Sequence, residues 1–279
     1  MHKIGLIAGG GGLGPTLARH CLAVGRPLFV IRLKGFAPSE LDEFEGEDVG
    51  LAELGKGFRA LRRAGCQAVC FAGKIDRPDM RHLKPDRRGL AALPGALMAA
   101  RRGDDALLSF LIGEFEKEGF VIEGPQQVMG ELVLSRGPQG RHAPSAENLA
   151  DVLRALEVAR AIGRLDVGQA VVCCDGLILA VEAQEGTDAM LRRVASLPST
   201  IRGDPGSPRG ALAKACKPGQ ELRIDLPTIG PETIQSAANA GLAGVAGEDG
   251  HALIVNREAT VALADALGLF IFGATAGKR

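Results

Sequence analysis

Charged and aliphatic side chains alternate along the segment 221–226, where the aliphatic ones are Leu222, Ile224 and Leu226. Because successive side chains of a β-strand point to opposite faces, a strand here places Arg223 and Asp225 side by side. A guanidinium next to a carboxylate suits a metal-bound phosphate: the cation pairs with phosphate oxygens and the anion with a divalent metal. Lys214 and Lys217 add positive charge just upstream. The same alternation is also the ordinary polar face of a half-buried strand.

Three carboxylates fall within seven residues further upstream, at Glu182, Glu185 and Asp188. Together with Asp225 from a separate strand, these oxygen ligands predict a site for magnesium or manganese. Thr187 and Asp188 also stand where the next helix is expected to begin, and capping that helix is the alternative role.

A glycine cluster near the amino terminus, Gly9-Gly-Gly-Gly-Leu-Gly14, matches the pattern G-x-G-x-x-G between an expected strand and an expected helix. Backbone N–H groups of such a loop bind phosphate at the helix amino terminus, and a tight structural turn is the alternative. The expected contacts are Gly10, Gly11, Gly12 and Leu13. The second strand ends in Arg32, Leu33 and Lys34 rather than in the acid that binds a ribose hydroxyl, which argues against a nicotinamide cofactor.

A second glycine turn, Gly73-Lys74, directly follows the expected strand 67–72. Ligands of parallel sheets bind at the carboxyl ends of strands, so Gly73 and Lys74 are further candidates for substrate binding, unless they form only a strand-to-helix turn. The segment 77–102 is rich in arginine and leucine. It is predicted to be a solvated helical face or partner surface, or alternatively a surface for anionic headgroups or acyl chains.

The composition excludes several classes of protein. The 33 basic and 33 acidic residues balance, and Trp and Tyr are absent, which argues against nucleic-acid binding. The six cysteines have no Cys-x-x-Cys spacing, so we expect buried thiols in a reducing compartment rather than disulfides or zinc. No signal-peptide or membrane-spanning pattern is evident, and a cytoplasmic protein is expected. Base rates favour a homodimer.

The order of elements predicts an α/β protein with two domains. Strands at 3–8, 28–33, 67–72 and 120–123 alternate with helices at 15–24, 57–64 and 104–117, which predicts a Rossmann-like domain with a parallel sheet over residues 1–136. Residues 137–144 have the composition of a linker. Residues 145–279 are predicted to form a second α/β domain of distinct topology, with a helix capped by Ser145, a hairpin around Asp175-Gly176, and strands at 221–226, 242–246, 252–255 and 269–272.

The longest of these motifs resemble one family. Glu185-Gly-Thr-Asp188 and the run from Lys217 to Gly230 resemble the carboxyl-terminal domain of the LpxI-type UDP-2,3-diacylglucosamine pyrophosphatases. The glycine cluster, Gly73-Lys74 and Gly103-Asp-Asp105 resemble the amino-terminal domain of that family. The likeness runs over essentially the whole chain, with Glu221 standing where many members are expected to have Asp.

The resemblance implies hydrolysis of the diphosphate of UDP-2,3-diacylglucosamine to 2,3-diacylglucosamine 1-phosphate (lipid X) and UMP, in lipid A biosynthesis of Gram-negative bacteria. It implies a divalent cation, with magnesium first and manganese or cobalt as alternatives, and a substrate held between the two domains. The essential aspartate of the family falls on Asp225. The expected metal ligands are Asp225, Asp188 and Glu185. The expected substrate contacts add five residues to those of the glycine turns: Thr187, Asp188, Lys214, Lys217 and Arg223.

A lipid substrate also implies transient contact with the cytoplasmic face of the inner membrane. Two other functions fit parts of the pattern. An NADP-dependent oxidoreductase accounts for the glycine cluster together with Arg32 and Lys34, but leaves the carboxylates of the second domain unexplained. A non-catalytic nucleotide-sugar sensor uses the same groups without turnover.

Overall fold

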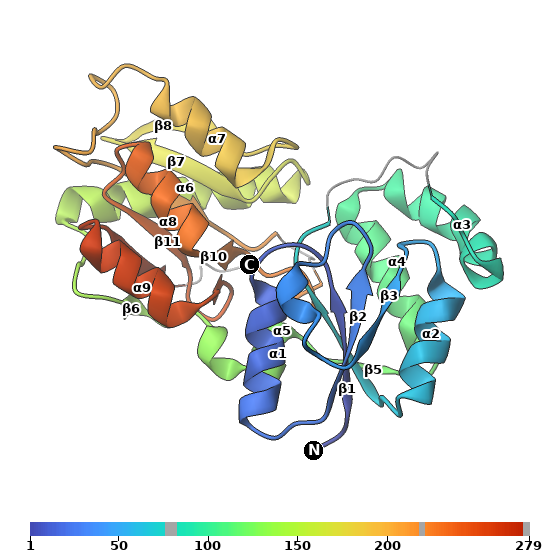
Figure 1. The fold of residues 1–279 in the computed structure, drawn as a ribbon. Coiled ribbons are helices and arrows are strands. Elements are labelled where there is room, and N and C mark those ends of the chain that lie inside the picture. Colours follow the sequence, from blue (N-terminus) through green and yellow to red (C-terminus); the bar gives the residue numbers. More distant parts are fainter. Residues whose placement is uncertain (76–82, 218–220, 276–279) are drawn as a thin grey trace. The chain divides into compact units, whose positions relative to one another are not determined.

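The computed structural model describes residues 1–75, 83–217 and 221–275, and divides them into two compact units (Figure 1). The first unit comprises residues 1–130 together with 221–224. The second comprises the rest of the chain from Glu131 onward. The mixed α/β fold with a parallel sheet in the first unit, predicted from the sequence, is confirmed.

The first unit is built on a five-stranded parallel sheet in the order β3-β2-β1-β4-β5. Its strands are β1 (Ile4–Ala8), β2 (Leu28–Leu33), β3 (Gly46–Val49), β4 (Ala68–Ala72) and β5 (Val121–Ile122). Its helices are α1 (Leu13–Ala23), α2 (Leu54–Arg63), α3 (Arg87–Ala100), α4 (Asp104–Lys117) and α5 (Pro125–Val128), with a 3₁₀ turn η1 (Ser39–Leu41). The apolar sequences of β1 and β4, and of β2 up to Arg32, fit strands buried on both faces.

The order of strands in this sheet fixes where a ligand would bind. The chain runs outward from β1 to β2 and β3, and then returns to place β4 on the other side of β1. The crevice between the carboxyl ends of β1 and β4 is therefore the topological switch point, where open α/β sheets bind ligands. α1 lies on one side of the sheet, and α2 and α4 lie on the other (Figure 1).

The second unit has a six-stranded mixed sheet in the order β6-β13-β11-β9-β7-β8. Its strands are β6 (Gly137–Pro138), β7 (Ala170–Cys174), β8 (Leu177–Val181), β9 (Ala211–Lys214), β11 (Gly244–Glu248) and β13 (Phe270–Ala274), with a separate pair of β10 (Thr228–Ile229) and β12 (Leu253–Ile254). Its helices are α6 (Ala146–Arg164), α7 (Gly186–Ala195), α8 (Pro231–Asn239) and α9 (Arg257–Ala266), with a 3₁₀ turn η3 (Gly130–Leu132) where the unit begins.

The core of the second unit lies on both faces of this sheet. α6 packs on one face through small and branched side chains such as Val152, Ala155 and Leu156. α7, α8 and α9 contribute to the cluster on the opposite face. β9, β11 and β13 run parallel, so their carboxyl ends meet at one edge.

Several local predictions are confirmed. Ser145 caps α6 by accepting a hydrogen bond from the N–H of Asn148 at 3.2 Å. Asp175 and Gly176 both have positive φ, as a two-residue hairpin turn with right-handed twist requires. The six cysteines are free and buried, and burial raises the pKa of the Cys66 thiol to about 11.

The strand predicted over 221–226 is wrong. Residues 222–224 form a turn, in which the N–H of Ile224 donates to the carbonyl of Glu221 at 3.1 Å. Two of the alternating aliphatic side chains nevertheless pack in the protein interior. Ile224 packs on the apolar cluster of the first unit, and Leu226 is buried in the second unit. Arg223 and Asp225 consequently belong to different units rather than to one strand face.

The boundary between the units also differs from the predicted linker 137–144. The contacts divide at Gly130 and Glu131, and Gly137–Pro138 already pairs with β13 as an antiparallel edge strand. Among the helices of the described part of the chain, none is both long and apolar enough to cross a membrane.

Candidate functional site

The two glycine turns of the first unit lie against each other at the switch point. The N–H of Gly10 donates to the carbonyl of Lys74 at 2.8 Å, and the N–H of Lys74 donates back to Gly10 at 2.9 Å. Two motifs about 60 residues apart in the chain are thereby joined at the carboxyl ends of β1 and β4. The Lys74 side chain is exposed beside the glycine loop.

Glycine is required at two of these positions because the backbones approach closely. A Cβ atom on Gly9 would lie 2.7 Å from the carbonyl oxygen of Lys74. Gly73 has a φ of +100°, and a Cβ atom there would lie 2.5 Å from the carbonyl oxygen of Gly10. These two glycines therefore hold the turns together, which is the structural alternative that the sequence left open.

The following residues of the loop have the geometry of an anion site. No hydrogen bond joins the N–H of Gly11, Gly12 or Leu13 to another of the described residues, and Gly11 and Gly12 are exposed. Gly11 has a φ of +85° with open space around it, and α1 begins at Leu13. N–H groups at the start of a helix attract phosphate through their donors and the helix dipole. The N–H of Gly10, in contrast, is already used by Lys74.

The cations at the end of β2 are paired within the first unit. The guanidinium of Arg32 donates to Asp48 at 2.7 Å and to the carbonyls of Leu41 and Phe44. Lys34 lies 3.4 Å from a carboxylate oxygen of Glu53. The cations on which an NADP site would depend are thus engaged within the protein, beside a hollow of about 230 Å³.

In the second unit, a buried lysine joins the end of β9 to β10. Lys214 is 6% exposed, and its ammonium donates to the carbonyl of Thr228 at 2.8 Å. Burial lowers the pKa of Lys214, while the charges of Glu182 and Asp188 act in the opposite direction. Because Thr228 follows Asp225 by three residues, this contact ties the Asp225 segment to the central strand of the sheet.

The carboxylates upstream of α7 are partly committed to local structure. Buried Glu182 accepts hydrogen bonds from the Thr187 hydroxyl at 2.6 Å and from the N–H of Gln169 at 3.1 Å. Glu185 accepts from the N–H of Ala183 and pairs with Arg193 at 2.9 Å. Thr187 therefore orients Glu182, and Asp188 lies exposed in the first turn of α7.

The other predicted cations are also paired. Lys217 lies 2.8 Å from Asp166. Arg223 makes a two-point contact with Glu221, at 2.9 and 2.8 Å, and a third contact with Glu116 at 2.9 Å. These side-chain contacts to the two carboxylates raise the pKa of Arg223. The segment is further held by the Gln126 amide, which donates to the carbonyl of Leu222 at 3.0 Å.

Asp225 is half-buried and directly follows the 222–224 turn, at the point where the chain passes into the second unit. Within the described residues, no group of three or more His, Cys, Asp and Glu side chains is placed to hold a metal ion. The expected set of Asp225, Asp188 and Glu185 is therefore not assembled into a metal site built by protein ligands alone. Glu185 fits the role least, because Arg193 and Ala183 engage its oxygens.

Sequence reasoning missed the partners of these residues. Glu116 pairs with Arg223, which lies 107 positions further along the chain, and no local sequence pattern predicts this pair. Glu248, at the end of β11, is buried between Arg160 and the N–H of Cys216 and so fixes the loop that leads to Lys217. A charged residue closing an apolar strand was the one available signal for Glu248.

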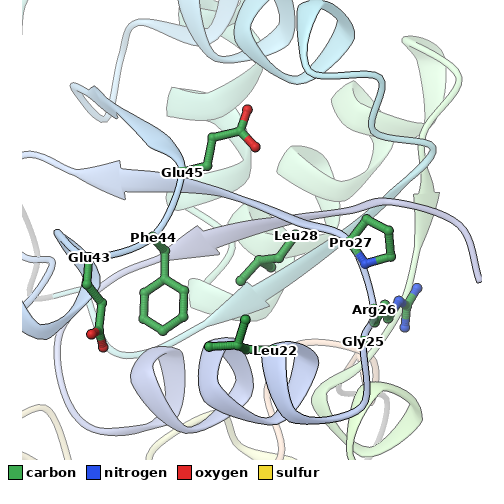
Figure 2. A pocket seen from close by; sticks show the side chains of 8 residues that line it. All are labelled: Leu22, Gly25, Arg26, Pro27, Leu28, Glu43, Phe44 and Glu45. Carbon is green, nitrogen blue, oxygen red and sulfur yellow. The ribbon is translucent and has the colours of Figure 1, made fainter.

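The larger hollow of the first unit lies away from this edge. It has a volume of about 440 Å³ and is lined by Leu22, Phe44 and residues 25–28 and 43–45 (Figure 2). Because Pro27 and Leu28 stand where β2 begins, the hollow lies at the amino ends of the strands, opposite to the glycine loop.

The chain is a two-domain α/β protein. Its first unit is Rossmann-like with a glycine loop at the switch point, and its second unit carries the buried Lys214 and the half-buried Asp225. The chain belongs to the LpxI family. The model of the LpxI N-terminal domain matches residues 3–132, and that of the LpxI C-terminal domain matches residues 135–272.

A curated relative from Caulobacter vibrioides (strain ATCC 19089 / CIP 103742 / CB 15), named UDP-2,3-diacylglucosamine pyrophosphatase LpxI, is 59% identical over 279 residues, covering 100% of both chains. Among solved structures, N5-carboxyaminoimidazole synthase from Aspergillus clavatus, in complex with ADP and 5-aminoimidazole ribonucleotide, is 13% identical with a TM-score of 0.24. The likeness covers 66% of this chain and 41% of that one and is too weak to inform the fold or function.

Proposed function

We propose that the protein hydrolyses the diphosphate of UDP-2,3-diacylglucosamine to 2,3-diacylglucosamine 1-phosphate and UMP, a step of lipid A biosynthesis. The observation that carries this proposal is the full-length relative of that name, at 59% identity without uncovered residues in either chain. Both family domains occur in the order in which the family has them.

The first unit supports the nucleotide half of this reaction. A diphosphate carries adjacent negative charges, and the unpaired N–H groups of Gly11, Gly12 and Leu13 within the described chain, with the nearby Lys74, are of the kind that binds them. Gly9 and Gly73 serve by allowing the close approach of the two turns, and Gly10 serves through its hydrogen bonds with Lys74.

The second unit supports the chemical step. In the proposed reaction water attacks the phosphorus on the sugar side, and UMP departs. Asp225 either orients that water and accepts its proton or holds the metal. Lys214, tied through Thr228 to the Asp225 segment, fixes the position of that segment.

A divalent cation, with magnesium first, is part of the proposal. Magnesium in phosphate chemistry is commonly held by one or two carboxylates together with substrate oxygens, so Asp225, with Asp188 as second candidate, fits that mode better than a three-ligand cage. When bound, the cation neutralises charge on the diphosphate. Removal of divalent metal with EDTA is expected to abolish turnover, and added magnesium, manganese or cobalt is expected to restore it.

The decisive experiment is to incubate the purified protein with UDP-2,3-diacylglucosamine and magnesium and to measure UMP. In oxygen-18 water, attack at the sugar side places the label in 2,3-diacylglucosamine 1-phosphate, whereas label in UMP would contradict that part of the proposal. Asp225→Asn is expected to reduce the turnover rate by at least about a hundredfold while substrate binding persists.

Glu232→Gln is the matched control, because Glu232 is an exposed carboxylate in the first turn of the nearby α8. Absence of UMP from the wild-type reaction, with substrate binding retained, would instead favour a nucleotide-sugar sensor. If Asp225 holds the metal, Asp225→Asn raises the magnesium concentration needed for the residual rate; if it acts on water, that concentration stays the same.

A further inference from the structure

Helix α3 packs on its neighbours through its smallest residues. A Cβ atom on Gly89 would meet the carbonyl oxygen of Ala52, and one on Gly95 would lie 2.6 Å from the Phe110 ring of α4. Ala92 is buried between these two glycines along the helix. The inner face of α3 is thus one of Gly and Ala, which allows close packing on α4 and on the segment before α2.

The opposite face of the same helix exposes its largest apolar residues. Leu90 is 60% exposed and Met98 is 67% exposed, and Leu97 and Pro94 are exposed between them. These positions follow each other at intervals of three and four residues, so they lie along one stripe. An ordinary surface helix does the reverse and buries such side chains.

Positive charge brackets this stripe at both ends. Arg87 begins the helix, and Arg101 and Arg102 follow its last turn, all three exposed. None of the three forms an ion pair with another residue of the described chain. The carboxylate of Asp86 accepts hydrogen bonds from the N–H groups of Gly89 and Lys56 and caps the start of the helix.

We propose that the outer face of α3, defined by Leu90, Pro94, Leu97, Met98 and the three arginines, docks on an anionic lipid bilayer. Exposed aliphatic side chains between cationic ends are the pattern of a helix that lies in the headgroup region, with its apolar side toward the acyl chains. The charge is complementary to anionic headgroups. The choice of a bilayer over another partner rests on the proposed function, because that substrate carries two acyl chains.

Vesicle sedimentation tests this surface directly. Wild-type protein is expected to sediment with vesicles of phosphatidylglycerol and phosphatidylethanolamine and to be released by high salt, which screens the arginines. The triple variant Leu90→Ser, Leu97→Ser, Met98→Ser is expected to bind at least about tenfold more weakly, because it removes the aliphatic area that enters the bilayer. Far-UV circular dichroism checks that it is folded.

The matched control is Leu22→Ser with Leu165→Ser. These residues are 72% and 75% exposed but lie on α1 and beyond the end of α6. The control is expected to bind vesicles as wild type does. Equal loss in both variants, unchanged binding of the triple variant, or no binding of wild type would each overturn the proposal. So would a wild-type dimer in solution that the triple variant converts to monomer without change in vesicle binding.

A single tryptophan gives a second readout, because the chain contains no Trp or Tyr. The emission of Met98→Trp is expected to shift to shorter wavelength when anionic vesicles are added, and that of Leu165→Trp is expected to stay unchanged. UMP release from substrate dispersed in detergent reports separately on the proposed function. If hydrolysis occurs in detergent but neither readout responds to vesicles, the proposed docking surface is wrong and the proposed activity stands. If the protein binds vesicles through α3 but does not hydrolyse the substrate, the docking surface stands and the proposed activity is wrong.

Discussion

Arg223 is expected from the sequence to clamp a phosphate, yet its guanidinium is directed at two carboxylates. Glu221 takes two of its contacts and Glu116 takes a third. A guanidinium engaged in this way positions the turn that precedes Asp225, so Arg223 is better described as a positioning residue.

The first prediction concerns the Arg223–Glu116 pair. Arg223→Ala and Glu116→Ala are each expected to lower the free energy of unfolding modestly, and the double variant is expected to lose no more than the larger single effect. The coupling energy should be about 0.5 kcal/mol, because both side chains are more than a third exposed and water screens them. Urea unfolding of the four proteins measures it. Purely additive losses would show that the pair has no energetic role.

Glu221 gives a pH-dependent prediction. The side-chain hydrogen bonds from Arg223 lower the pKa of Glu221. The resulting stabilisation is present above the ordinary glutamate pKa of about 4.3 and is lost as the pH falls through the lowered folded-state value. The difference in unfolding free energy between wild type and Glu221→Gln should therefore shrink below about pH 4 and stay constant at neutral pH. A constant difference across the acid range would contradict the assignment.

Lys214 gives a second pH-dependent prediction, with the same sign as that of Glu221 but at alkaline pH. Burial lowers its pKa in the folded state, so between that value and about 10.4 the unfolded chain binds more protons than the folded one. Stability consequently rises with pH across this window. Relative to Lys214→Met, the wild-type protein is expected to gain unfolding free energy as the pH rises toward about 10.4, measured by urea unfolding. A gap that narrows with rising pH would show that the charged lysine is stabilised instead.

At the scale of elements, the paired glycine turns are the feature most sensitive to substitution. Gly73→Ala forces a methyl group toward the Gly10 carbonyl at a φ that side chains avoid. The variant should lose on the order of 2 kcal/mol of unfolding free energy, and it should also bind substrate more weakly. Gly113→Ala is the matched control, because this glycine lies within α4 with open space around it and should gain about 0.5 kcal/mol. Thermal unfolding compares them. Equal effects would show that the contact between turns relaxes freely.

The sequence predicted elements well where one local pattern decides them. Apolar runs predicted β1, β4 and most of β2, and the hairpin turn residues predicted β7 and β8. It missed β9, whose four residues Ala-Leu-Ala-Lys have weak strand propensity and are buried by their neighbours. It also missed β3, a polar edge strand, and helix α9. The sequence predicted which residues belong to the candidate site. It did not predict the partners of Arg223, Lys214 and Glu185, because these depend on tertiary contacts between residues that are distant in the chain or on local folding that spacing alone does not show.

At the scale of the whole molecule, the chain enters the first unit twice. Residues 221–224 belong to the first unit although both flanking stretches belong to the second. Ile224 packs on the cluster that contains Phe58, Phe115 and Phe120. Asp225 therefore directly follows a four-residue segment anchored in the first unit, and the stability of that anchor should determine how firmly the start of the Asp225 segment is held.

The last prediction follows from this anchoring. Ile224→Ala removes a half-buried side chain and should destabilise the first unit by about 1–2 kcal/mol, less than the loss for a fully buried isoleucine. Hydrogen exchange read by mass spectrometry should show faster exchange in peptides from α2 and α4, with peptides from β7 and β9 unchanged. Ile201→Ala, at an exposed position of the second unit, is the control and should change neither. If exchange instead rises in β7 and β9, Ile224 stabilises the second unit. Because Asp225 is the next residue, a slower turnover of Ile224→Ala with unchanged substrate affinity would link the anchor to the position of the aspartate rather than to nucleotide binding.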